Sequence, residues 1–343
     1  MTRSLSVLIS TYLEPDQVER IADVDARLRV MYEPDLLPVP RYRADHTGTP
    51  RALDDTRVRR WERLLADADI AFDFDWQAPE RLRERSPNLK WVQATSAGVG
   101  AFMRRTGLDD TDLVVTTAAG VHAMPLAEFA VAGALHFIKG FDELRQRQGA
   151  RVWRRHATRQ LAGRTVTVVG LGGMGRQTVR HFHALGTQVI AVGRPGGSYD
   201  LPPGVTLSDT SQLADVLPQT DVLVLCCALT VETEGLIGRA EIRLLPKQAI
   251  LVNISRGQVV DEGALVEALA DKRIAGACLD VFATEPLPTD SPLWVMDNVV
   301  VSPHSASTVA TENIDITTLF VDNIGRWLGG QPLRNRYRPE LGY

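Results

Sequence analysis

The sequence predicts an α/β protein with doubly wound parallel sheets, organised in two domains. Two series of short apolar runs are separated by stretches whose apolar residues recur at helical spacing, which indicates alternating strands and helices. Runs of the second series are almost continuously apolar, as expected of strands that helices cover on both faces. At 343 residues, the chain also exceeds the usual size of one hydrophobic core.

The predicted strands fall into an N-terminal and a central series. The first series comprises Val7–Ile9, Ile70–Phe74, Trp91–Gln93 and Val114–Val115. The second comprises Thr165–Val169, Gln188–Val192, Val222–Leu225, Ala249–Val252, Gly276–Val281 and Val299–Val301. Residues 34–56 contain four prolines and show no clear period, so we assign them as a loop.

Two apolar helices are expected around the second series. Residues Pro125–Lys139 form an apolar stretch with proline in its first turn, too short to span a membrane, and we expect it to pack against something large. An amphipathic pattern from Ile314 to Leu328 ends at two glycines, a normal helix stop. This last helix is expected to return to the first domain.

Composition excludes several functional classes. The formal net charge is -4 with acids and bases mixed, which argues against a nucleic-acid partner. The N-terminus lacks the apolar length of a signal peptide, and no run approaches the roughly 20 apolar residues of a membrane span, so a cytoplasmic protein is expected. The three cysteines have neither metal nor disulfide spacing, and we expect buried free thiols and no metal site.

A glycine fingerprint follows the first strand of the second series. Gly170, Gly172 and Gly175 give G-x-G-x-x-G, with Gly173 and Met174 between them, directly before a predicted helix over Arg176–Leu185. The first glycine permits a tight turn, the second a close approach of the backbone to a pyrophosphate, and the third close helix packing. The segment therefore predicts a dinucleotide site.

The residues at the end of the next strand indicate which dinucleotide binds. An acid there would bond the ribose hydroxyls of NAD, but this chain has Gly193 followed by Arg194. The missing side chain leaves room for a 2′-phosphate and the guanidinium offers it a planar cation. NADP(H) is favoured, and NAD(H) with a solvent-facing Arg194 is the alternative.

Three polar residues each stand just beyond an apolar strand: Arg256, Glu285 and His304. Ligands in open α/β sheets bind outside the carboxyl ends of the strands, so these side chains can converge on one site. His122, His136, His181 and His183 have no such partners in the sequence pattern, and we expect structural roles for them.

These segments resemble the D-isomer-specific 2-hydroxyacid dehydrogenase family over almost the whole chain. The resemblance rests on the glycine fingerprint, SRG followed by VDE, DVF followed by EPLP, SPLW, SPH, and TSAGVG at Thr95–Gly100. It implies that Arg256 binds the substrate carboxylate and carbonyl, that His304 is the acid/base, and that Glu285 orients and charges His304. Reduction of a keto acid needs such a cation and proton donor, with a hydride from the cofactor.

The resemblance implies further site residues and an architecture. Backbone N–H groups of Ala97 and Gly98 would complete carboxylate binding, and Asp280 would lie near the nicotinamide carboxamide. A Rossmann dinucleotide-binding domain, residues 120–306, would be inserted into a smaller flavodoxin-like α/β substrate domain formed by 1–119 and 307–343. A homodimer is expected through the apolar helix. The implied activity is hydride transfer between NAD(P)H and a small 2-keto or D-2-hydroxy acid, of the glyoxylate or hydroxypyruvate type.

Two other kinds of protein share this fold. Formate dehydrogenases resemble the chain but pair glutamine with the catalytic histidine, so Glu285 argues against them. Related corepressors keep the triad but normally carry long partner-binding tails, and the two domains account for nearly all of this chain. The cluster Trp153, Arg154 and Arg155 fits an anion-binding role across a dimer interface and a solvated charged face equally well.

Overall fold

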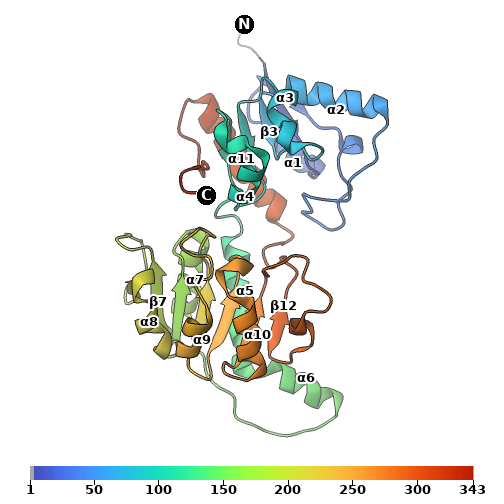
Figure 1. Ribbon diagram of the computed structural model, residues 1–343. Helices are drawn as coiled ribbons and strands as arrows, with labels where there is room; N and C mark the ends of the chain where they lie inside the picture. Colours follow the sequence, from blue (N-terminus) through green and yellow to red (C-terminus); the bar gives the residue numbers. More distant parts are fainter. Residues whose placement is uncertain (1–3, 343) are drawn as a thin grey trace. The chain divides into compact units, whose positions relative to one another are not determined.

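The computed structural model describes residues 4–342 and divides into two compact units. The first unit combines residues up to His122 with those from Thr308 onward, and the second comprises Ala123–Ser307 (Figure 1). Both are α/β layers built on parallel sheets. Among residues 4–342, no helix has the combined length and apolar character needed to cross a membrane.

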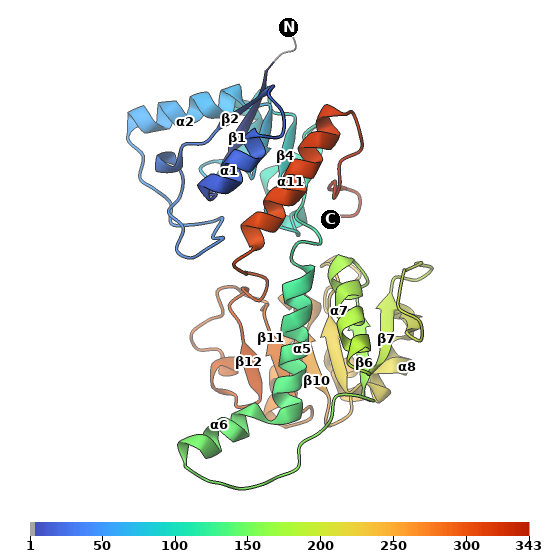
Figure 2. The same cartoon turned by 180° about the vertical axis from the view of Figure 1, so that it is seen from behind.

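The first unit contains, within the described residues, a parallel sheet of five strands in the order β2-β1-β3-β4-β5, which is the flavodoxin-like order. Helices α1 and α11 cover one face of this sheet (Figure 2). Helices α2, α3 and α4 pack on the other. The elements are β1 (Leu5–Ile9), α1 (Pro15–Ala22), β2 (Leu28–Met31), α2 (Asp55–Asp67), β3 (Ile70–Phe72), α3 (Leu82–Arg85), β4 (Trp91–Gln93), α4 (Gly100–Thr106), β5 (Val114–Thr116) and α11 (Glu312–Leu328).

The second unit contains, within the same described range, a parallel sheet of seven strands in the order β12-β11-β10-β9-β6-β7-β8. Strand order reverses between β6 and β9, the arrangement of a doubly wound dinucleotide-binding sheet. The elements are α5 (Ala123–Lys139), α6 (Phe141–Gly149), β6 (Thr165–Val169), α7 (Gly173–Ala184), β7 (Gln188–Gly193), β8 (Thr206–Asp209), α8 (Leu213–Val216), β9 (Val222–Leu225), α9 (Arg239–Leu244), β10 (Ile250–Asn253), α10 (Glu262–Ala270), β11 (Gly276–Leu279) and β12 (Val299–Val301).

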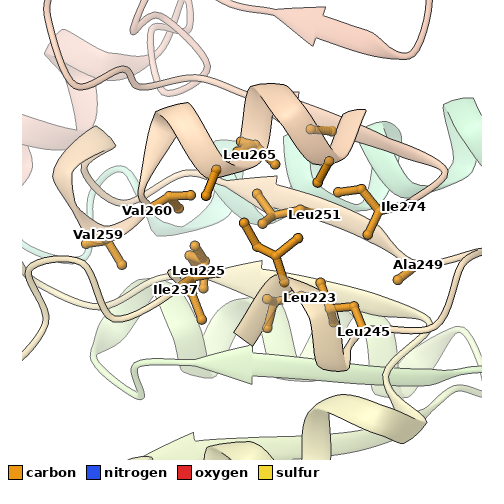
Figure 3. Close-up of a cluster of buried hydrophobic side chains, with 14 of the residues drawn as sticks. Leu223, Leu225, Ile237, Leu245, Ala249, Leu251, Val259, Val260, Leu265 and Ile274 are labelled. Carbon is orange, nitrogen blue, oxygen red and sulfur yellow. The ribbon is translucent and has the colours of Figure 1, made fainter. Parts of the chain in front are cut away.

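Alternate residues of the central strands enter separate cores. Leu223 and Leu225 of β9 pack with Leu251 of β10 and Leu265 of α10 on one face (Figure 3). Val222 and Val224 belong to the core under α5 and α7 on the opposite face. Because successive strand residues point to opposite faces, two covered faces require a continuous apolar run. This confirms the physical basis on which the strands were predicted.

Each predicted strand is present, and two further strands were missed. Strands β2 and β8 form edges of their sheets, and β8 has no fully buried residue. Polar residues interrupt both runs, Arg29 in β2 and Ser208 and Asp209 in β8, so neither strand gives a continuous apolar signal. The segment 34–56 is loop apart from a short 3-10 helix over Pro34–Leu36 and a bridge between Val39 and Thr49.

Both predicted apolar helices pack as expected. Helix α5 lies so close to β11 that a Cβ on Gly133 would be 2.6 Å from Cys278 Sγ, and the face of the helix that carries Ala130 and Ala134 is buried in the second unit. Helix α11 returns to the first unit, where the Phe320 ring lies 5.2 Å from Phe72 and 5.2 Å from Trp91, centroid to centroid. The cysteines Cys226 and Cys278 are buried free thiols.

Candidate functional site

The glycine loop joins β6 to α7 by a turn that excludes side chains. Gly170 has φ +95°, and a Cβ there would be 2.5 Å from Cys227 Cα. A Cβ on Gly175 would be 1.7 Å from the Gly170 carbonyl oxygen. Helix α7 therefore begins directly against the end of β6, which only glycine at these two positions allows.

The open side of the same loop fits a dinucleotide phosphate. No atom lies within 4 Å of the position that a Cβ on Gly172 would take, so the loop backbone is accessible from that side. The N-terminus of α7 starts at Gly173, where the helix dipole and unpaired N–H groups favour an anion. The loop lies beside the point where the strand order reverses. These residues fit the pyrophosphate of a bound NAD(P).

Strand β7 ends at Gly193, and the chain turns immediately after Arg194. The Gly197 N–H donates to the Arg194 carbonyl oxygen at 3.0 Å, and Gly196 has φ +70°. Pro195 in second place and glycine with positive φ in third are the signature of a type II turn. The turn places the exposed Arg194 at the end of β7. β7 is the next strand along the chain after the glycine loop.

His304 and Glu285 form a direct pair. His304 Nδ1 lies 2.7 Å from Glu285 Oε2, and the other carboxylate oxygen accepts the Phe282 N–H at 3.0 Å. Burial works to raise the pKa of Glu285, but hydrogen bonds from His304 and Phe282, with the charge of Arg256, hold the pKa below its ordinary value. Glu285 is therefore a carboxylate at neutral pH, oriented on the imidazole.

Asp280 organises the loop that carries His304. Its Oδ1 accepts hydrogen bonds from Ser302 Oγ at 2.6 Å, Ser305 N at 2.9 Å and Ala306 N at 2.9 Å. Burial raises the pKa of Asp280, against the effect of these hydrogen bonds. His304 adopts φ +52°, an uncommon backbone conformation for a residue other than glycine. Asp280 thus anchors the backbone on both sides of His304.

Arg256 follows β10, as predicted, beside the Phe282–Glu285 segment. The Asn253 side chain donates to the Arg256 carbonyl oxygen at 3.0 Å, and Arg256 Nη1 donates to the Ser255 carbonyl at 2.7 Å. Burial lowers the pKa of Arg256, while Glu285 and Asp280 act in the opposite direction. A guanidinium remains charged at neutral pH under such a shift. Arg256, Glu285 and His304 therefore all stand at the carboxyl edge of the larger sheet.

Ala97 and Gly98 belong to the first unit, in the loop that follows β4. The Ser96 carbonyl accepts the Ala118 N–H at 3.0 Å, and Ser96 Oγ accepts the Gly98 N–H at 3.3 Å. These contacts hold the loop beyond the carboxyl end of its sheet. A role for Ala97 and Gly98 in carboxylate binding stays a prediction.

A buried polar cluster in the first unit was missed. His122 Nε2 lies 3.2 Å from Glu312 Oε1, and His46 Nε2 lies 3.9 Å from the same oxygen. Burial lowers the pKa of His46, although Asp73 and Glu312 oppose this shift. His136 Nε2 likewise lies 2.7 Å from Asp142 Oδ2, so both histidines have carboxylate partners in the structure. Partners of His122 and His46 are remote in sequence, so no local pattern reveals them.

Comparisons with known proteins agree with this geometry. The model of the D-isomer specific 2-hydroxyacid dehydrogenase NAD binding domain matches residues 131–306. (S)-sulfolactate dehydrogenase of Chromohalobacter salexigens is 32% identical over 72% of this chain and 80% of its own. Glyoxylate/hydroxypyruvate reductase B of Pectobacterium carotovorum is 30% identical over 81% of this chain and 88% of its own.

A solved structure extends the likeness to the whole chain. The D-isomer specific 2-hydroxyacid dehydrogenase of Xanthobacter autotrophicus Py2, in complex with NADPH and MES, is 29% identical, covers 99% of this chain and 100% of its own, and superposes with a TM-score of 0.78. The glycine loop, the histidine and glutamate pair, and the arginine after β10 are the features that the sequence resemblance implied. The chain belongs to the D-isomer specific 2-hydroxyacid dehydrogenase family and is an NAD(P)-dependent oxidoreductase.

Proposed function

We propose that this enzyme reduces a small 2-keto acid of the glyoxylate or hydroxypyruvate type to the D-2-hydroxy acid, with NADP(H) as the preferred cofactor. The observation that carries the proposal is the 2.7 Å contact between His304 and Glu285 at the same sheet edge as Arg256. The Pectobacterium relative, named a glyoxylate/hydroxypyruvate reductase, supports the substrate class. The relative named a sulfolactate dehydrogenase indicates that relatives of this chain also act on other 2-hydroxy acids.

The proposed chemistry divides among three side chains. Bound nicotinamide supplies a hydride to the carbonyl carbon. Arg256 binds the substrate carboxylate with a planar, charge-assisted grip, and the N–H groups of Ala97 and Gly98 complete that binding. His304 faces Glu285 through Nδ1, so Nε2 is the atom that delivers a proton to the carbonyl oxygen. Glu285 stabilises the protonated imidazole before that transfer.

The cofactor preference rests on the end of β7. Gly193 offers no carboxylate to bond the ribose hydroxyls of NAD, and Arg194 beside it can pair with a 2′-phosphate. The Xanthobacter structure was solved with NADPH, which supports this choice. Asp280 is proposed to lie near the nicotinamide in addition to anchoring the His304 loop, because it stands at the end of β11.

The proposed homodimer involves α5 and the segment that follows it. One face of α5 is buried in the second unit, while Val131 is only partly buried and Met124 is 48% exposed. Apolar side chains after α5 are exposed as well: Phe141 is 48%, Val152 50% and Trp153 98% exposed. A fully exposed tryptophan beside other exposed apolar residues is typical of a contact surface.

Arg256→Lys tests the proposal that Arg256 binds the substrate carboxylate. Lysine keeps the positive charge but loses the planar fork, so kcat/KM for glyoxylate and hydroxypyruvate should fall by about 100-fold or more through misalignment. Steady-state kinetics with both keto acids measure this. Arg239→Lys is the matched control, because Arg239 pairs with Glu267 on the surface. Equal activity of the two variants would contradict the assignment of Arg256.

Glu285→Gln should shift the pH dependence of both directions. Gln removes the negative charge that lies 2.7 Å from His304 Nδ1 and so destabilises the protonated imidazole. The alkaline limb of reduction and the acidic limb of oxidation should both move to lower pH in kcat/KM profiles. Glu262→Gln removes a nearby charge but keeps an oxygen that can accept the Ala283 N–H, and it should move neither limb. An unmoved profile in Glu285→Gln would refute the coupling.

Arg194→Ala should weaken NADPH selectively. Loss of a charge-assisted contact to the 2′-phosphate should raise the Kd for NADPH by about tenfold and leave the Kd for NADH nearly unchanged. Titration of each cofactor against the native and variant enzymes gives both constants. Arg180→Ala, which removes an exposed arginine of α7, serves as the control. Native preference for NADH would sink the proposal.

Light scattering tests the dimer. The native protein at micromolar concentration should have twice the mass of one chain, and Trp153→Ser should shift the population toward the monomer because it removes the most exposed apolar side chain. A single-chain mass for the native protein at that concentration would exclude the homodimer.

A further inference from the structure

We propose that Tyr199 is a second determinant of cofactor choice, because its ring fills the space into which a side chain at position 193 would project. This inference deepens the proposed function and rests on the assignment of the β7 end as the ribose site. It assigns the missing acid at position 193 to a steric cause inside the protein. The expectation that the absent side chain leaves room for a 2′-phosphate is therefore wrong at this position, because Tyr199 occupies that space.

The contacts of Tyr199 with two glycines carry the inference. A Cβ on Gly193 would lie 2.4 Å from Tyr199 Cε2. The next two nearest atoms, Cζ at 2.7 Å and Oη at 2.8 Å, belong to the same tyrosine side chain. A Cβ on Gly197 would lie 2.4 Å from Tyr199 Oη. Neither glycine has a positive φ, so their backbones accept any L residue. The tyrosine ring is therefore the obstacle at both positions.

Tyr199 is held in place by a hydrogen bond and by packing. Its hydroxyl oxygen accepts the Arg194 N–H at 2.9 Å. The half-buried ring packs against the core formed by β6, β7 and α7. The type II turn of residues 194–197 brings Gly197 back over the ring, so both glycines lie against the same ring edge. Moving the ring aside breaks the bond to Arg194 and exposes apolar surface.

Cofactor choice follows from this arrangement. An NAD-type site places a carboxylate at the end of this strand to bond the ribose hydroxyls. Aspartate at position 193 would collide with Tyr199, and a displaced ring would release the Arg194 backbone that it now holds. Recognition of NAD by an acid at position 193 therefore requires a change at position 199 as well. One substitution alone is expected to damage the site without converting it.

A double-mutant cycle with Gly193→Asp and Tyr199→Ala tests this coupling. Isothermal titration of native protein, both single variants and the double variant gives a Kd for NADH and for NADPH in each. Gly193→Asp alone should bind both cofactors more weakly than the native protein. The double variant should bind NADH at least about tenfold more tightly than Gly193→Asp does, while NADPH stays weak. Equally tight NADH binding by Gly193→Asp and the double variant would overturn the proposal.

Two further variants separate the steric effect from the other contacts. Tyr199→Phe removes the bond to Arg194 but keeps the ring, so in the Gly193→Asp background it should not restore NADH binding. Gly197→Ala adds a methyl group without charge and should lower the unfolding temperature in the native background, and much less in the Tyr199→Ala background. Equal losses in both backgrounds would show that the ring is not the obstacle and would overturn the proposal even if Gly193→Asp failed to fold.

The cycle also distinguishes this inference from the proposed function. Native preference for NADH would contradict NADP(H) specificity, yet the difference between Gly193→Asp and the double variant would still decide whether Tyr199 blocks position 193. Absence of turnover with keto acids leaves the titrations and unfolding measurements interpretable, because neither requires catalysis.

Discussion

The contact between the end of β6 and the start of α7 is the constraint on which the second unit depends. Gly175 lies so close to the Gly170 carbonyl that any side chain would collide with it, and Gly170 itself lies against Cys227 after β9. This packing brings a helix N-terminus to the point where strand order reverses. The helix dipole and the accessible Gly172 backbone then face the same side, which is what a dinucleotide phosphate requires.

The proposed catalytic site depends on a second set of contacts, which are polar. Asp280 accepts three hydrogen bonds from residues on both sides of His304, and Glu285 pairs with the ring itself. The buried Asp280 thus fixes the backbone of the histidine loop, and the exposed Glu285 contacts the ring at Nδ1. The two acids follow the same strand, β11, and this explains how a short segment can position an imidazole whose backbone has φ +52°.

Backbone and side-chain contacts together also determine the structure of the segment after β7. Pro195 and Gly196 direct the chain into a tight turn, and Tyr199 closes against both flanking glycines. The position of Arg194 therefore depends on the whole turn. In the proposed cofactor site, Gly193 and Tyr199 constrain one another, so we expect residues 193–199 to act together in cofactor recognition.

The amino-acid sequence by itself determined the α/β class, the central strands, the glycine loop and the order of Arg256, Glu285 and His304 along the strand ends. These features are local, because buried parallel strands are continuously apolar and a tight phosphate turn demands glycine at fixed spacing. Only the tertiary structure revealed the edge strands β2 and β8, the three hydrogen bonds that Asp280 accepts, and the position of the Tyr199 ring against Gly193. The cluster of His46, His122 and Glu312 likewise joins residues from three distant segments. Such contacts depend on how separate elements pack, and packing leaves no period or spacing in the chain.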